Sequence, residues 1–317
     1  MDIQAFYSLV STTVVLFLLI ATGFVARKTG IIDDASSKRL SKLIIYVGQP
    51  MMILHALTNI EYSAQNVKNG FFILAVSICL HIFLCVFAFF ASKGIKDFNE
   101  RKIAEFSMAF TNSGFIGFPI FRSVFGDIGE FWGAFFVISF HLFIWTRGMM
   151  ILARGRDDIK VTVKKIFINP GTIPCVIGII LYLLTKYITI PRIFIEYSGY
   201  LSNLCAPISS LIVGALIATR KPKQIFLDIK GYYVCLCRLI VMPLIVCLIA
   251  KFAGLNNDVI LFMTTAAALP SATNLTMFSE LYDITPGYAA QTIGLTSVLT
   301  IATMPLVILA ANAIILL

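Results

Sequence analysis

The chain has 317 residues, of which 59% are hydrophobic and only 13% are charged, and its formal net charge is +9. Soluble domains carry about a quarter charged residues, so this composition excludes a soluble globular protein and predicts a polytopic membrane protein. The positive charge does not predict binding to nucleic acid, because the Lys and Arg residues fall in short loops between apolar segments, as a topology signal does.

Apolar segments long enough to cross a bilayer follow one another along the whole chain. A transmembrane helix needs about 20 mainly apolar residues. The sequence predicts ten such spans, and the polar connections between them are short. The spans cover residues 4–26, 38–59, 70–91, 103–125, 130–152, 170–189, 196–219, 231–252, 257–280 and 286–315.

The basic residues are unequally divided between the two sets of connections. Of the 25 Lys and Arg residues, 19 lie in or beside the connections that follow spans 1, 3, 5 and 7, five lie on the other side, and Arg238 lies inside span 8. Cytoplasmic loops carry the excess of Lys and Arg. We therefore expect a multi-pass protein of the cytoplasmic membrane with both termini on the extracellular side.

No pattern in the sequence predicts catalysis or a bound metal. The seven cysteines lie inside apolar spans and form no CxxC pair, so we interpret them as packing residues. Metalloprotease, nucleophile-elbow, P-loop and dinucleotide-binding motifs are missing. We expect a protein that is not an enzyme and that has no cofactor.

The fourth predicted span is interrupted at its centre by Asn112-Ser113-Gly114-Phe115-Ile116-Gly117-Phe118-Pro119. Pro119 removes a backbone donor and clashes with the preceding turn, and Gly114 and Gly117 weaken a helix by about 1 kcal/mol each relative to alanine. Freed backbone groups are tolerated in a membrane only where protein or a water-filled cavity covers them. The motif predicts a helix broken at mid-membrane, which is a typical position for the binding site of a transporter.

A similar interruption in the ninth predicted span indicates an internal repeat. Span 9 contains Leu269-Pro270-Ser271-Ala272-Thr273-Asn274, and Pro270 lies 158 residues after Asn112. Pro50 in span 2 and Pro207 in span 7 are separated by 157 residues, which is nearly the same offset. Each half contains five spans, an odd number, so the halves 1–158 and 159–317 are predicted to be inverted repeats whose broken spans 4 and 9 meet near the bilayer midplane.

Polar side chains at the two breaks are the first candidates for ligand binding. They bind a polar ligand or satisfy the freed backbone groups. Gln49 in span 2 and Asn203 in span 7 either contact substrate or hold helices together. The candidates at the breaks are Asn112, Ser113, Ser271, Thr273 and Asn274, whereas Gly114, Gly117, Pro119 and Pro270 set the shape of the breaks.

Charged residues inside the spans favour an anionic ligand. Arg238 either extends to the inner surface or attracts and binds an anion. Neither break contains a carboxylate, which argues against a mid-membrane aspartate as an ion carrier. His55, His81 and His141 are interpreted as packed, hydrogen-bonded residues rather than proton carriers. The resulting cavity is predicted to be neutral to positive and to suit an organic anion.

The span-4 and span-9 motifs together resemble the auxin efflux carrier family of permeases, which is related in fold to the bile acid/auxin/arsenite transporters. The resemblance covers the whole chain and is greatest to the microbial permeases, because the central loop is short. It implies a scaffold domain of helices 1, 2, 6 and 7, a transport domain of helices 3–5 and 8–10, and elevator-type alternating access. It also implies a substrate such as malate, malonate or an auxin-like acid, and a possible homodimer.

Two other functions remain open at this point. The first is a bile-acid-type symporter in which sodium is coordinated by backbone carbonyl and side-chain oxygens, and coupling to protons is a further variant. The second is a membrane sensor that binds its ligand without moving it. The expected partners in every case are a small organic anion and the lipid bilayer.

Overall fold

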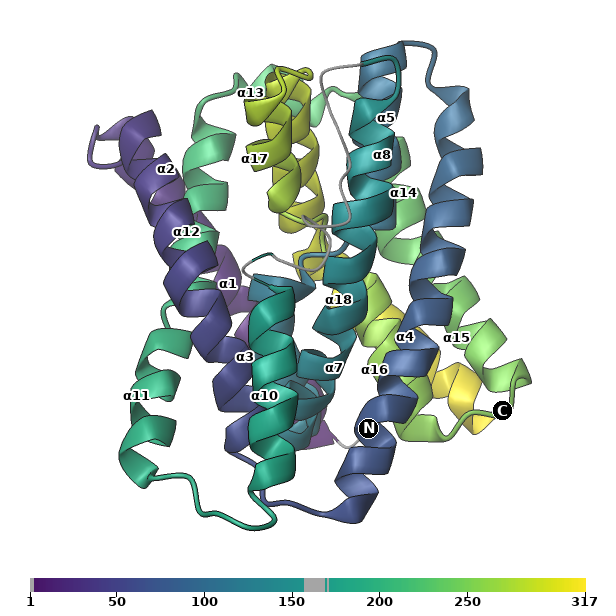
Figure 1. Cartoon of the computed structure of the whole chain (residues 1–317). Helices are drawn as coiled ribbons and strands as arrows, with labels where there is room; N and C mark the ends of the chain where they lie inside the picture. Colours follow the sequence, from purple (N-terminus) through teal and green to yellow (C-terminus); the bar gives the residue numbers. More distant parts are fainter. Residues whose placement is uncertain (1–2, 157–168, 170) are drawn as a thin grey trace.

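The computed structural model describes residues 3–156, 169 and 171–317, and within these ranges the secondary structure is helical apart from one isolated β-bridge (Figure 1). Within the described ranges, short turns join consecutive helices. Four single turns of π-helix occur: η1 (Ile44–Gly48), η3 (Ser113–Gly117), η4 (Ile144–Gly148) and η5 (Cys237–Val241). The α-helices are α1 (Ile3–Lys28), α2 (Asp34–Leu43), α3 (Gln49–Thr58), α4 (Ala64–Ala91), α5 (Phe98–Ala109), α6 (Phe118–Phe125), α7 (Asp127–Phe143), α8 (Met149–Ala153), α10 (Thr172–Leu184), α11 (Arg192–Ser202), α12 (Cys205–Ala218), α13 (Pro222–Phe226), α14 (Ile229–Leu236), α15 (Met242–Phe252), α16 (Asn257–Ala268), α17 (Asn274–Leu281) and α18 (Pro286–Leu316).

Many of these helices are apolar enough to cross a membrane. In the described part of the chain, seven helical segments are long and apolar enough to do so. Shorter apolar helices cover Ser113–Phe125 and Thr172–Leu184. The prediction of an all-α, multi-pass membrane protein is therefore confirmed, whereas the count of ten spans and the inverted repeat remain predictions. The predicted boundary between the halves, at residues 158 and 159, lies outside the described residues. The seven segments are Ile3–Lys28, Asp34–Thr58, Ala64–Gly94, Asp127–Ala153, Arg192–Ala218, Ile229–Phe252 and Pro286–Leu316.

Polar caps at the loop ends decide where several helices begin. The Asp33 side chain accepts a hydrogen bond from the Ser36 backbone N–H at 2.6 Å, which satisfies a free donor of the first turn and lowers the pKa of Asp33. Asp97 caps α5 in the same way. The helix that carries the predicted span 4 begins at Phe98, five residues before the predicted start of the span at residue 103, because Asp97 caps it there.

Proline explains three of the four π-turns. Pro50, Pro119 and Pro243 each follow a π-turn by two residues. The proline ring clashes with the carbonyl four residues earlier and offers no N–H to it. The preceding turn therefore widens, and such widened turns frequently occur at functional sites.

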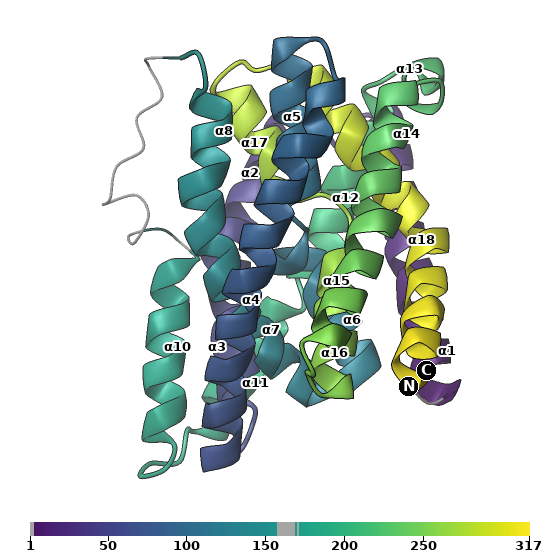
Figure 2. The same ribbon diagram turned by 90° about the vertical axis from the view of Figure 1, so that its right-hand side faces the viewer.

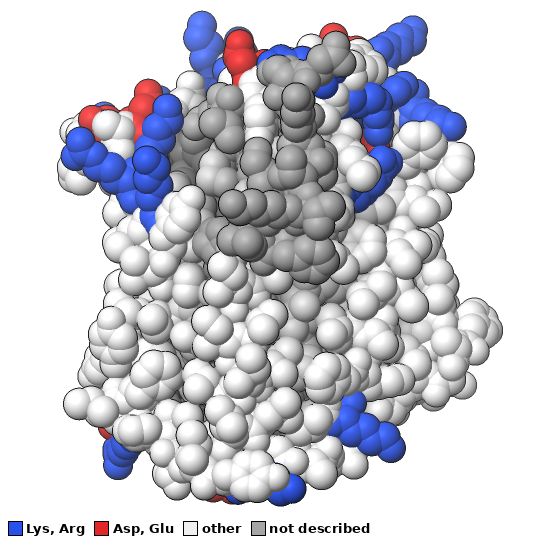
Figure 3. Space-filling view, viewed as in Figure 1, with Lys and Arg blue, Asp and Glu red and all other residues white. Residues whose placement is uncertain are grey.

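The helices form one bundle in which two interrupted segments cross. Figures 1 and 2 place α5 and α17 towards one end of the bundle and α6 and α16 towards the other. The N and C marks lie towards the same end of the bundle in both views. Lys and Arg side chains gather at the opposite end, as Figure 3 shows for one face of the molecule.

The backbones of α1 and α12 pack in direct contact because glycines face the partner helix. An added Cβ on Gly214 would lie 1.9 Å from the Ile20 carbonyl oxygen, and one on Gly23 would lie 2.1 Å from the Leu211 carbonyl oxygen. Small residues allow this close approach between helices in a membrane. The two glycines thus fix α1 and α12 as a pair.

This packing predicts that Gly214→Ala destabilises the protein. The new methyl group must push α1 away from α12, and overpacking of this kind costs about 1–3 kcal/mol. Thermal unfolding of the detergent-purified variant should show a lower midpoint than wild type. Gly94→Ala is the matched control, because nothing lies within 4 Å of a Cβ at Gly94. Equal midpoints for Gly214→Ala and Gly94→Ala would contradict the proposed contact.

Candidate functional site

The two interrupted segments are joined by backbone hydrogen bonds where they cross. Helix α5 ends at Ala109 and α16 ends at Ala268, and an antiparallel bridge pairs Thr111 with Ser271. The Asn112 N–H donates to the Pro270 carbonyl at 2.8 Å, and the Ala272 N–H donates to the Phe110 carbonyl at 3.0 Å. Backbone groups released from helices are thereby satisfied, as the interior of a membrane requires.

Asn112 and Ser113 carry polar atoms that this backbone pairing does not use. The Asn112 carbonyl oxygen accepts from the Ile116 and Gly117 N–H groups, at 3.2 and 3.0 Å. In contrast, the side-chain Nδ2 of Asn112 and the Oγ of Ser113 are buried and have no hydrogen-bond partner. Buried polar groups without a partner are rare in proteins and call for an explanation. These two donors are available to a ligand.

The glycines of the span-4 motif let other side chains reach the crossing. An added Cβ on Gly114 would lie 2.9 Å from Nε2 of Gln49, and one on Gly117 would lie 3.1 Å from Cδ1 of Leu269. Gln49 begins α3 and is only 2% exposed. The predicted candidate Gln49 therefore lies against the span-4 motif, although it is more than 60 residues away in the sequence.

His141 extends this polar group beyond Gln49. Its Nε2 lies 3.1 Å from Nε2 of Gln49, and because an amide nitrogen only donates, the histidine nitrogen accepts this hydrogen bond. Its Nδ1 is buried without a partner. The His141 ring packs directly on Gly171, where an added Cβ would lie 2.1 Å from the ring. The sequence interpretation of His141 as a packed, hydrogen-bonded residue agrees with this contact, but it did not identify Gln49 as the partner.

The remaining polar candidates differ in their surroundings. The Ser271 hydroxyl donates to the Ser107 carbonyl at 3.0 Å, so it stabilises the crossing itself. Thr273 and Asn274 are half-buried at the start of α17. Asn203 is exposed at the C-terminal end of α11, and the structure does not bring it to the crossing.

Arg238 lies in η5, and its side chain is fully buried. The sequence left open whether this side chain reaches the inner surface, and at 0% exposure it does not. All three guanidinium nitrogens are without a hydrogen-bond partner in the described structure. The turn η5 packs against α5, α16 and α18, the helices that lead to the crossing.

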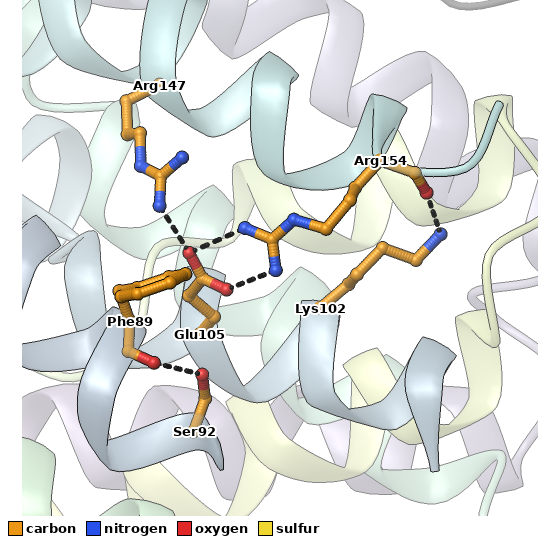
Figure 4. Close-up of polar contacts among 6 residues, drawn as sticks. All are labelled: Phe89, Ser92, Lys102, Glu105, Arg147 and Arg154. Atoms are coloured by element: carbon orange, nitrogen blue, oxygen red, sulfur yellow. Dashed lines mark hydrogen bonds and ion pairs between the residues drawn. The ribbon is translucent and has the colours of Figure 1, made fainter. Parts of the chain in front are cut away.

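A buried carboxylate organises the end of the bundle where Lys and Arg gather (Figure 4). Glu105 of α5 is 0% exposed and accepts from Arg147 at 2.7 Å and from both terminal nitrogens of Arg154 at 2.9 and 3.0 Å. Both guanidinium groups also lie about 6 Å from the Phe89 ring centre. Lys102 donates to the Arg154 carbonyl at 3.1 Å. These contacts clamp α4, α5 and α8 together.

Several polar residues of the crossing were not anticipated from the sequence. The hydroxyl groups of Ser107, Thr111 and Ser297 are buried and have no partner. Thr111 lies beside the recognised motif, so it could have been found there. Ser107 and Ser297 occupy ordinary helical positions, and no local pattern distinguishes them.

The all-helical, multi-pass fold defines a polytopic membrane protein, and comparison with known sequences identifies its kind. A family model described as membrane transport protein matches residues 8–308. An uncharacterized transporter of Methanocaldococcus jannaschii is 22% identical over 305 residues, which cover 92% of this chain and 95% of the relative. An uncharacterized transporter of Methanothermobacter thermautotrophicus is 21% identical over 301 residues, covering 93% and 96%.

The chain is thus a membrane transporter. It belongs to the membrane transport protein family, which confirms the resemblance to the auxin efflux carrier permeases.

The buried Glu105 clamp predicts that Glu105→Gln destabilises the protein by about 3 kcal/mol. Removing one member of a buried ion pair leaves the remaining charges uncompensated. The matched control is Glu196→Gln, whose pair with Arg192 is exposed, with side chains 55% and 91% accessible. Exposed pairs contribute less than about 1 kcal/mol. Thermal or denaturant unfolding of both variants checks this difference, and equal stabilities for the two would contradict the clamp.

Proposed function

We propose that this protein is a secondary transporter or uniporter for a small organic anion, a mono- or dicarboxylate such as malate or malonate or an auxin-like acid. The observation that carries the proposal is the crossing, where Asn112 and Ser113 carry unpartnered donors and the next residue, Gly114, is approached by Gln49. The site forms where two interrupted segments meet inside a bundle, which is the usual place for substrate in transporters with inverted repeats.

The architecture behind the proposal is ten spans in two inverted halves. The described helices group into five spanning units before the central segment and five after it, when α5–α6 and α16–α17 are each taken as one interrupted span. The two hydrogen bonds around the Thr111–Ser271 bridge are reciprocal, as a local two-fold axis in the membrane plane requires. Both features support the repeat.

The proposed orientation places the Lys- and Arg-rich end in the cytoplasm. Figure 3 shows basic side chains gathered at that end and few at the other. The positive-inside rule then puts both termini on the extracellular side, since they lie towards the opposite end in Figures 1 and 2. Three of the 19 basic residues assigned to this side from the sequence, the lysines at 160, 164 and 165, lie outside the described residues.

An anion is the favoured substrate because the crossing offers donors and no negative charge. The Asn112 amide donates, and the first N–H groups of η3 and α17 carry partial positive charge. Among the described residues, the most deeply buried carboxylate, Glu105, is already bound by Arg147 and Arg154. We assign Asn112, Ser113 and Gln49 as the substrate contacts, with Thr273 and Asn274 at the edge.

The proposed transport cycle is an elevator movement of one domain against another. The pair α1–α12, which packs through glycine, together with α2, α3, α10 and α11, forms the scaffold in this proposal, and the remaining spanning helices form the transport domain. Gln49 of α3 meets Gly114 of η3 across this boundary. A contact across the boundary suits a site that changes its access when one domain slides. A homodimer through the scaffold belongs to the same proposal.

This assignment predicts that Asn112→Ala lowers anion uptake by about tenfold or more. Loss of a hydrogen bond to a charged group costs about 1.5–3 kcal/mol, and 1.4 kcal/mol corresponds to tenfold. The measurement is uptake of labelled malate, malonate and indole-acetate into proteoliposomes. Asn203→Ala is the control, because Asn203 is exposed. Equal loss in both variants, or no uptake of any of these anions by folded wild-type protein, would contradict the proposal. Binding without uptake would favour a sensor.

The lack of a free carboxylate at the crossing further predicts that uptake does not depend on sodium. Backbone carbonyl oxygens can coordinate sodium without a carboxylate, but the free amide nitrogen of Asn112 is a donor and disfavours a cation beside it. Replacing sodium with choline at constant ionic strength should leave the initial rate unchanged. A rate that falls to background without sodium would instead establish a bile-acid-type symporter, and a rate that follows an imposed pH gradient would establish proton coupling.

A further inference from the structure

We propose that Arg238 holds a small inorganic anion, for which chloride is the natural probe, as a resident ion in the interior of the transport half. This site goes beyond the proposed function, because it is held by Arg238 of η5 and not by the substrate contacts assigned on η3 and α3. Its central ligand is the Arg238 guanidinium, and the helices that pack against η5 carry further unpartnered donors.

The guanidinium of Arg238 is a buried charge that needs a counter-charge. Its exposure is 0%, and Nε and both terminal nitrogens are unpartnered. Arginine stays protonated in proteins and presents five N–H donors in a planar fork. Burying such a charge without a partner costs several kcal/mol even after relaxation. Water alone would satisfy the N–H donors but would leave the positive charge uncompensated. A bound anion accepts the hydrogen bonds and also neutralises the charge.

No carboxylate in the described part of the chain supplies that counter-charge. Glu105 is bound by two arginines on another side of α5. Glu100 pairs with Lys230 at 2.5 Å, and Asp228 accepts from the Gln291 side chain at 2.7 Å. The structure gives Arg238 no ion pair with any described acidic residue.

Two helices that pack against η5 carry unpartnered hydroxyl groups. Ser107 on α5 and Ser297 on α18 are 0% and 4% exposed, and η5 packs against both helices. Their hydroxyl groups have no partner, and neither does that of Thr111, which bridges to Ser271. The guanidinium fork of Arg238 is itself a donor set that suits a small anion, and these helices carry further donors.

His81 is another fully buried residue on α4, at the position that the repeat offset of 157 residues relates to Arg238. Its Nδ1 is held by the Ser77 carbonyl at 2.8 Å and the Ser139 hydroxyl at 3.0 Å, and its Nε2 is buried and free. The ring is thus fixed by neutral partners and adds no negative charge.

The enclosed position of Arg238 favours a resident ion over the transported carboxylate. Arg238 is enclosed by α5, α14, α15, α16 and α18, all on the transport side of the proposed boundary. Gln49 and the free Asn112 amide lie at η3, where a scaffold helix meets the crossing. A resident anion behind the crossing would fix the backbone geometry on which the substrate face depends.

Binding of chloride to the purified protein tests this site without any transport measurement. The experiment combines thermal unfolding with equilibrium dialysis of radiolabelled chloride, in chloride or gluconate at constant ionic strength. For wild type we expect near-stoichiometric binding and a midpoint that rises by about 2 °C or more per tenfold chloride above the dissociation constant. Arg238→Met should bind no chloride and unfold at a midpoint independent of it, whereas Arg238→Lys should retain weaker binding.

The outcomes separate this site from the substrate site. Arg192→Met is the matched control, because that arginine is 91% exposed, and it should behave as wild type. Chloride dependence that persists in Arg238→Met would overturn the proposal as a general salt effect. A shift with malonate but none with chloride would also overturn it and make Arg238 a substrate ligand. Failure of uptake with intact chloride binding would count against the proposed function alone.

Discussion

The constraint on which the rest of the structure depends is that backbone N–H and C=O groups inside a membrane need partners. Two helices end inside the bundle, at Ala109 and Ala268. The backbone segments that follow them pair with each other through the bridge between Thr111 and Ser271. Because the backbone satisfies itself there, the side chains of Asn112 and Ser113 are left free. An uninterrupted helix would hide its backbone dipoles, whereas a crossing gathers helix ends and free side chains at one depth.

The residues around the crossing follow from that constraint. Glycine at position 114 lets Gln49 approach, and proline at positions 119 and 243 accompanies widened turns that carry or adjoin functional candidates. Farther away, Glu105 ties Arg147 and Arg154 to α5. The clamp keeps the charges of Glu105, Arg147 and Arg154 paired, whereas Arg238 has no ion pair with any described acidic residue. The family membership makes the chain a membrane transporter, and the free donors at the crossing support the proposal of an anionic substrate.

The sequence was sufficient for the class of protein and for the position of the crossing, because both depend on local chemistry. Long apolar runs identify spans, and glycine with proline in mid-span identifies an interruption. The contact between Gln49 and Gly114 was not predictable, because it depends on how distant helices pack. The same holds for His141, whose role comes from a neighbour 92 residues away. Arg238 was recognised as unusual, but only its surroundings separate a surface anchor from a buried charge.

The most direct test of the central claim is whether the crossing can be reached from both sides of the membrane. Thr273→Cys, in a background in which the seven native cysteines are replaced, offers a reactive thiol at the edge of the crossing. Lys96→Cys, at an exposed position of the basic end, reports one-sided access. The account predicts that an impermeant thiol reagent labels position 273 from either face, that substrate slows both reactions, and that position 96 reacts from one face only. Labelling of position 273 from a single face, unaffected by any organic anion, would contradict it.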